Sequence, residues 1–282
     1  MPSLAYTRSG AGAPLVLLHG IGSSRHAWEP VIPALAAHFT VIAVDLPGSG
    51  DSRPLPAHTE PTPAALAAAV AQLLDDLGLT SPHLAGNSLG GWVTLELAAI
   101  RPAASLTLLS PAGLWHGDAP LYDRVSLRAS RWFAWHAGGL LSRLMNYRIG
   151  RALILGQTHG RPMRLTTEYA QAAIHAIGTS AGFDEILTAS VKRRYLATAP
   201  IGALATVAFG SRDRLLLRHQ SRHLDQLPDD THVAVLPGCG HVPMADDPEA
   251  VTAVITETTR RAVASNRDTG RHERLGISCP CP

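Results

Sequence analysis

The sequence predicts an α/β fold, a mostly parallel central sheet covered by helices on both faces and carrying an inserted helical cap. Short, continuously apolar segments alternate with helical patterns, which is typical of parallel strands that are buried on both faces. The alternation stops between about residues 113 and 199, where helical periodicity, arginines and three tryptophans replace the strand-like segments. The chain has 282 residues, 46% of them apolar, so it can bury one large core or two small ones.

The predicted strands are short apolar segments bounded by glycine, proline or a polar residue. In chain order they span residues 15–18, 41–44, 84–85, 106–109, 203–209 and 232–236. A strand with one solvated face would alternate polar and apolar residues. The continuous apolar character of these segments therefore favours helices on both faces of the sheet.

The clearest predicted helix spans residues 63–77. Thr62 can cap its N-terminus, Pro63 fits the first helical position and Gly78 can end it. Further helices are expected over residues 90–100, 218–227 and 248–264. The sequence thus divides into a core of residues 1–112 and 200–264, a cap of residues 113–199, and a polar tail of residues 265–282 that we expect to be disordered.

Charge and the length of apolar segments exclude several classes of function. The formal charge is +2, from 24 basic and 22 acidic residues, and only 16% of residues are charged against about 25% in ordinary globular proteins, so we expect no nucleic-acid partner. The apolar stretches are far shorter than the roughly 20 residues that a membrane-spanning helix requires. The first residues, MPSLAYTRSG, lack the basic and apolar regions of a secretion signal, so a cytoplasmic location is expected.

Cysteine and histidine spacing predicts neither disulfides nor a metal site. Cys239 stands alone, and Cys279 and Cys281 lie two apart near the C-terminus, which fits no disulfide framework or zinc motif. We therefore expect no metal and no cofactor. Residues 111–199 hold eleven basic and five acidic residues, a charge of +6 that could attract an acidic substrate but equally fits solvated helix faces.

The sharpest motif is Gly86-Asn87-Ser88-Leu89-Gly90, which lies between a predicted strand and a predicted helix. A nucleophilic serine on such a turn needs glycines on both sides, because the backbone is strained and passes close to its neighbours. The following helix also points its positive end at the reacting centre. Taken alone, the motif fits an ordinary glycine-rich loop as well.

Four segments in a fixed order resemble the α/β-hydrolase superfamily, over roughly residues 4–264. They are His19-Gly20-Ile21-Gly22, Asp45-Leu46-Pro47-Gly48-Ser49-Gly50-Asp51-Ser52, the serine turn, and Gly238-Cys239-Gly240-His241-Val242-Pro243. The resemblance is to the serine-nucleophile, esterase-like branch with a helical cap, and it implies the α/β-hydrolase fold. The branches that use an aspartate nucleophile, dehalogenases and epoxide hydrolases, are disfavoured by Ser88.

The resemblance implies a catalytic triad in the chain order serine, acid, histidine. Ser88 would be the nucleophile and His241 the general base. Asp213 fits the acid best, because it follows a predicted strand and precedes the histidine by 28 residues. Asp225, Asp229 and Asp230 are better explained as solvent-facing charges, and the alternative acid position after residues 106–109 holds Ser110 and Pro111 instead.

The resemblance also assigns supporting roles. It places the oxyanion hole at the backbone N–H groups of Ile21 and Leu89. His19 and Asp45 would brace loops without transferring protons. For the substrate pocket, the sequence offers aromatic and sulfur-containing side chains that could line it or pack a core. The candidates are Trp28, Trp132, Trp135 and Met145, with Trp92 and Phe133 as further possibilities that fit core packing or the cap.

The function expected from these residues is hydrolysis of a carboxylic ester or thioester of a small to medium, largely apolar small-molecule substrate, through an acyl-enzyme on Ser88. The first alternative is hydrolysis of a carbon–carbon bond in a ring-cleavage product, although Gly22-Ser23-Ser24-Arg25 departs from the oxyanion loop of those enzymes. Cofactor-free haloperoxidase activity would use the same triad. A ligand-binding or receptor-type protein with little turnover is another class, and monomer or homodimer is left open.

Overall fold

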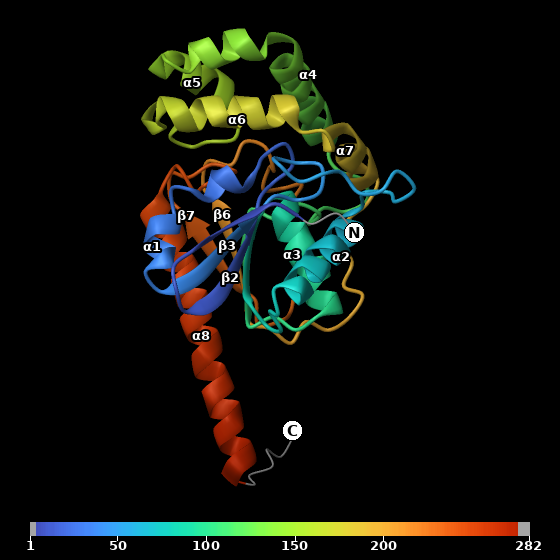
Figure 1. Cartoon of the computed structure of the whole chain (residues 1–282), viewed down its shortest axis with the longest axis vertical. Helices are drawn as coiled ribbons and strands as arrows, with labels where there is room; N and C mark the ends of the chain where they lie inside the picture. Colours follow the sequence, from blue (N-terminus) through green and yellow to red (C-terminus); the bar gives the residue numbers. More distant parts are fainter. Residues whose placement is uncertain (1–3, 276–282) are drawn as a thin grey trace.

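The computed structural model describes residues 4–275, with side chains as far as Ser265. A twisted sheet forms its centre, helices cover both faces, and a group of helices lies above one edge (Figure 1). The strand order is β1-β3-β2-β4-β5-β6-β7, with β1 antiparallel to β3 and every other neighbour parallel. The strand bounds are β1 Tyr6–Ser9, β2 Ala13–Leu18, β3 Phe39–Val44, β4 His83–Asn87, β5 Ser105–Leu109, β6 Ala205–Gly210 and β7 His232–Leu236.

The six predicted strands are present, and the α/β class with a mostly parallel sheet is confirmed. Strand β1 was not predicted. Its sequence, YTRS, is polar and largely exposed, because it lies at the sheet edge and pairs only with β3. An edge strand of this kind carries none of the continuous apolar signal on which the prediction rested.

Alternate residues of β2 face the two apolar layers. Val16 and Leu18 belong to one core cluster with residues of α2 (Pro63–Asp76) and α3 (Leu89–Ile100). Leu15 and Leu17 belong to the other, with residues of α1 (Ile32–Ala36) and α8 (Pro248–Leu275). This period of two is what a strand buried on both faces requires. As predicted, Thr62 accepts a hydrogen bond from Ala65 N–H (3.2 Å) and caps α2.

Two expectations are wrong. Residues 218–227 form turns instead of a helix, since His223 N–H donates to Leu114 O (3.0 Å), outside the segment, and the Arg222 guanidinium lies 4.2 Å from the centre of the Phe209 ring. These contacts with neighbouring elements replace the i to i−4 ladder. Helix α8 continues to Leu275, so residues 265–275 are not the expected disordered tail. Residues 276–282, with Cys279 and Cys281, lie outside the described residues.

The segment predicted as a cap is helical and lies above the sheet in Figure 1. It contains α4 (Leu121–Leu144), α5 (Arg148–Leu155), a short 3₁₀ turn η2 (Pro162–Arg164), α6 (Thr167–Thr179) and α7 (Phe183–Val191). These helices have a small apolar core of their own, made of Met145, Leu155, Leu165, Ala170 and Ile174. Among the residues that the structure describes, no helix combines the length and apolar character needed to cross a bilayer.

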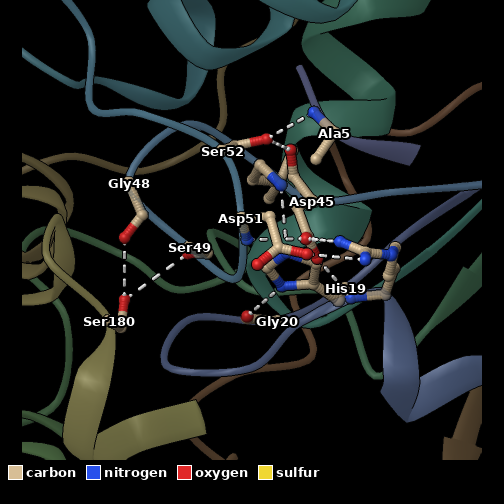
Figure 2. A network of polar contacts seen from close by, with 11 residues as sticks. Ala5, His19, Gly20, Asp45, Gly48, Ser49, Asp51, Ser52 and Ser180 are labelled. Atoms are coloured by element: carbon tan, nitrogen blue, oxygen red, sulfur yellow. Dashed lines mark hydrogen bonds and ion pairs between the residues drawn. The ribbon is translucent and has the colours of Figure 1, made fainter.

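The cap contacts the core where Gly182 packs closely against Gly48, in the loop after β3. Ser180 Oγ donates to Gly48 O at 3.2 Å (Figure 2). Gly182 N–H donates to the same oxygen at 2.8 Å. A Cβ at Gly48, whose φ is +76°, would lie 2.7 Å from Gly182 Cα. The close approach therefore requires glycine at this position.

Candidate active site

Ser88 occupies the tight turn between β4 and α3. Its φ of +56° is uncommon for a non-glycine residue, and such strain persists only where the surroundings hold it. A Cβ at Gly86 would lie 2.2 Å from Gly90 O, and one at Gly90 would lie 2.2 Å from Leu18 O. The two glycines of the motif are thus required by packing. The resulting turn presents Ser88 to a cavity beneath the cap.

His241 and Asp213 form a buried pair at the ends of neighbouring strands. Asp213 follows β6, His241 follows β7, and His241 Nδ1 lies 2.9 Å from Asp213 Oδ2. Asp213 Oδ1 accepts from the backbone N–H groups of Leu215 and Leu216, at 3.0 and 2.9 Å. Burial opposes ionisation, but His241 and these hydrogen bonds outweigh it and lower the pKa of Asp213 below its ordinary value. The carboxylate therefore stays charged and holds the Nδ1 proton.

Ser88 and His241 line the same cavity. His241 Nε2 is buried and has no hydrogen-bond partner within residues 4–265, so the contact with Ser88 Oγ is not formed in this structure. Asn87, which sequence reasoning treated only as part of the motif, joins the two loops. Its Nδ2 donates to His241 O (2.9 Å) and to Leu109 O (3.0 Å). The serine turn and the histidine loop are thereby held against each other.

The loop after β2 passes directly beside the nucleophile position. A Cβ at Gly20 would lie 3.1 Å from Ser88 Cβ. In the described part of the chain, the backbone N–H groups of Ile21 and Leu89 donate to no protein acceptor. Two free donors next to Ser88 are what an oxyanion hole requires.

A polar network supports this loop (Figure 2). His19 Nε2 accepts from Leu46 N–H (3.0 Å), so its Nδ1 carries the proton and donates to Gly20 O (2.7 Å). Burial lowers the pKa of His19, which keeps the ring neutral. Both ring nitrogens are occupied by backbone groups, consistent with the structural role expected of this residue.

Asp45, also in Figure 2, braces the same loop from the end of β3. It is fully buried and accepts from the backbone N–H groups of Arg25 (2.7 Å) and Asp51 (3.0 Å) as well as from the Arg25 guanidinium. Ser52 Oγ donates to Asp45 O (2.8 Å) and accepts from Ala5 N–H (2.9 Å). The carboxylate thus holds the backbone of two loop segments together.

A family model described as "Alpha/beta hydrolase family" matches residues 15–254. The chain belongs to the alpha/beta hydrolase family. Solved structures agree on the fold: an esterase from Thermogutta terrifontis has a TM-score of 0.73 at 23% identity, over 92% of this chain and 93% of that one. A meta-cleavage product hydrolase from Pseudomonas fluorescens has a TM-score of 0.70 at 20% identity, over 92% and 94%.

Relatives by sequence are mostly hydrolases. A pimeloyl-(acyl-carrier protein) methyl ester esterase of Edwardsiella ictaluri is 28% identical over 91% of this chain and 97% of that protein. Epoxide hydrolase EphH of Mycobacterium tuberculosis is 30% identical over 68% of this chain and 92% of that protein. The dihydrolipoyllysine-residue acetyltransferase component of the acetoin cleaving system of Cupriavidus necator is 42% identical over 40% of this chain, but the match spans only 30% of that protein's length.

The cavity that Ser88 and His241 line has a volume of about 1270 Å³ and lies between the sheet edge and the cap. Most side chains that the cap contributes to it are apolar; examples are Phe133, Ala134, Leu141, Ile174 and Ile177. His159 is a polar exception that sequence reasoning missed. It is buried, its Nε2 has no hydrogen-bond partner among the described residues, and burial lowers its pKa to about 4. The ring is therefore neutral near pH 7.

The structure corrects the four side chains expected to contact substrate, because none of them lines this cavity. Trp28 is fully buried in the apolar layer that contains residues of α1 and α8, and Met145 is fully buried in the core of the cap. Trp132 and Trp135 are 55% and 63% exposed. Helix α4 turns positions 126, 130, 133 and 134 towards the cavity, and at 3.6 residues per turn the two tryptophans fall on the opposite face.

Asp246 is a second brace that sequence reasoning missed. Its Oδ2 accepts from Gly240 N–H and Gly160 N–H, both at 2.7 Å, and its Oδ1 accepts from Arg161 N–H (2.8 Å). It therefore ties the loop that carries His241 to the cap. The only sequence signal was an aspartate five residues after the histidine, in a segment with no expected role. The described residues contain no group of three His, Cys, Asp or Glu side chains able to hold a metal ion.

Proposed function

We propose that this protein is a serine hydrolase that cleaves carboxylic esters or thioesters through an acyl-enzyme on Ser88. One observation carries the proposal. A strained serine opens onto the same cavity as a histidine whose Nδ1 is held 2.9 Å from a buried carboxylate. This is the arrangement that makes a serine hydroxyl nucleophilic at neutral pH.

The residues would act in two half-reactions. Asp213 keeps the proton on His241 Nδ1, so Nε2 can take the proton of Ser88 Oγ as the oxygen attacks the carbonyl carbon. The N–H groups of Ile21 and Leu89 would stabilise the oxyanion that forms. Collapse releases an alcohol or thiol that receives the proton from Nε2. Water then attacks the ester on Ser88, giving its proton to Nε2, and the acid leaves as Oγ is reprotonated.

The first proton transfer needs a hydrogen bond between Ser88 Oγ and His241 Nε2. This contact is absent here, as is common in structures without substrate, and it would form when substrate binds. The apolar cavity of about 1270 Å³ fits a small to medium, largely apolar substrate. The esterase among the full-length relatives supports the reaction class, and Ser88 at the nucleophile position argues against the epoxide chemistry named for another relative.

Labelling with a fluorophosphonate at neutral pH tests the proposal. We expect one adduct, located on Ser88 by peptide mass and lost in Ser88→Ala. Ser130→Ala is the matched control, because Ser130 lines the same cavity on α4 but has no base beside it in the proposed mechanism. The unlabelled wild type should also hydrolyse a small aryl ester, and labelling should abolish this activity. No adduct in folded protein, or an adduct on another serine, would refute the proposal.

A substrate comparison separates the carbon–carbon alternative. The ester and a vinylogous diketo acid would be assayed with the same enzyme. We expect the ester to be turned over faster. A kcat/KM for the diketo acid well above that of any ester would reassign the reaction while leaving Ser88 as the nucleophile.

A further inference from the structure

A second, smaller pocket adjoins Ser88. It has a volume of about 50 Å³ and shares Ser88, Ile21, Leu127 and Leu215 with the large cavity. Its wall also contains Leu89, so both proposed oxyanion donors border it. Since one water-sized sphere needs roughly 10–15 Å³, the pocket has room for about three to five non-hydrogen atoms. A group attached to a carbonyl held by Ile21 and Leu89 could therefore occupy it.

Most of this wall is apolar, but a carboxyl group interrupts it. Asp123, in the first turn of α4, is only 3% exposed. Both of its carboxyl oxygens are buried and have no hydrogen-bond partner within residues 4–265. Arg124 also borders the pocket but forms no hydrogen bond to either oxygen of Asp123. Burying a carboxyl group that has no hydrogen-bond partner lowers the free energy of unfolding, so its presence in this wall needs an explanation.

A hydroxyl lines the same wall. Ser190, on α7, is buried, and its Oγ likewise has no partner in the described part of the chain. The side chains around the two polar groups include Trp92, Trp115 and Leu187. A small apolar pocket with a few convergent polar groups is the usual form of a site that recognises one functional group of a ligand.

We propose that this pocket is the subsite for a short hydroxylated acyl group, whose hydroxyl is bound by Asp123 and Ser190. The inference rests on the proposed function, because it assigns the acyl part of the ester carried by Ser88. An acyl group that carries a hydrogen in place of this hydroxyl would fill the pocket but leave the polar groups of Asp123 and Ser190 without a hydrogen-bond partner. Sites built to bind a hydroxyl reject such analogues strongly for that reason.

The ionisation of Asp123 favours a hydroxyl over a charged group. Burial raises the pKa of Asp123 to about 7, with Asp213 adding to the rise and His241 opposing it. Near neutral pH the carboxyl is therefore present in both forms. A hydroxyl can accept from the protonated form and donate to the ionised form, whereas an ammonium group would pair only with the ionised form.

The test compares two esters that differ in one hydroxyl, p-nitrophenyl 3-hydroxybutanoate and p-nitrophenyl butanoate. The measured quantity is the ratio of their kcat/KM values in one enzyme preparation, which cancels any difference in folded fraction. We expect the wild type to prefer the better enantiomer of the hydroxylated ester by about tenfold or more. Asp123→Leu should bring the ratio to about one or below.

Further variants locate the effect. Asp123→Asn should keep part of the preference, because an amide can still donate and accept, and Ser190→Ala should lower it less than Asp123→Leu does. Asp118→Asn is the control, since Asp118 is exposed and lies outside the pocket, and the substitution makes the same change from carboxyl to amide. Its ratio should equal that of the wild type.

Several results would overturn the subsite. A wild-type ratio near one, or a ratio that Asp123→Leu leaves unchanged while both esters are hydrolysed, would remove it and leave the proposed function standing. A preference for p-nitrophenyl 3-aminobutanoate instead, lost in Asp123→Leu, would replace the hydroxyl by a cation. Absence of hydrolysis of both esters would also overturn the subsite, and together with no fluorophosphonate adduct on Ser88 it would refute the proposed function as well.

Discussion

Replacing Asp246 by alanine should lower both turnover and stability, because this carboxylate holds the histidine loop to the cap. It is 6% exposed and accepts three backbone hydrogen bonds of 2.7 to 2.8 Å, from Gly240, Gly160 and Arg161. Hydrogen bonds to a charged group contribute about 1.5–3 kcal/mol each, and three that share one carboxylate are not additive. We expect the free energy of unfolding to fall by about 3–5 kcal/mol, which lowers Tm by about 5–9 °C for a chain of 282 residues.

Turnover should fall as well, since Gly240 directly precedes His241. A displacement of about 1 Å at a catalytic group costs on the order of 100-fold, and we expect kcat for an aryl ester to drop by about that factor with a smaller change in KM. Steady-state kinetics well below the Tm of the variant and thermal unfolding by circular dichroism measure the two effects. The control is Asp247→Ala, which removes the adjacent carboxylate that binds Arg161 and Ala250 but keeps the contact to Gly240. A kcat within threefold of wild type and a Tm within 2 °C would show that Asp246 does not position the loop.

Three further changes have defined outcomes. Asp213→Asn should fold yet lose about 10⁴-fold in kcat, because the imidazole loses the charge that selects its tautomer; activity near that of wild type would move the acid elsewhere. Burial lowers the pKa of His159 to about 4, whereas its pKa in the unfolded chain is about 6.5. The free energy of unfolding should therefore decrease as pH falls from about 6.5 towards 4, by about 2–3 kcal/mol at pH 4.5. Urea unfolding at pH 7 and 4.5 should show this loss in wild type and a smaller one in His159→Gln; equal losses would contradict it. Gly48→Ala should lower the free energy of unfolding by about 2 kcal/mol or more, because φ at this position is +76° and the new Cβ would lie too close to Gly182. An unchanged Tm would argue against this close contact between the cap and the core.

The strands and the triad candidates could be read from the sequence because their signals are local. Each buried strand is a continuous apolar segment, and Ser88 and His241 lie in short motifs whose glycines are required by close packing. Asp213 was predicted from the chain order that the family resemblance implies and from its position after a strand, and it lies 2.9 Å from His241. The parallel strands end at one edge of the sheet, so residues that directly follow different strands are brought together.

The errors and omissions arise where long-range contacts decide the outcome. Residues 218–227 carry a helical pattern, yet Arg222 and His223 bond to distant elements and the helix does not form. The tryptophans at 132 and 135 have the composition of a pocket wall, but the rotation of α4 turns them to solvent. Asp123 resembles any acidic residue in a first helical turn, and only the packing of α4 against the core reveals that it is buried without a partner.

Asp45 and Asp246 perform the same physical task on the two irregular loops that border Ser88. Each is buried, each binds backbone N–H groups of its own loop, and neither is the acid paired with His241. The loops cannot satisfy these N–H groups by regular structure, because they must leave the sheet and approach the serine turn closely. A carboxylate can accept several donors at once, so one side chain fixes a whole loop. Asp246 differs in that its carboxylate also binds backbone N–H groups of the cap, at Gly160 and Arg161, so one side chain makes the position of His241 depend on the cap.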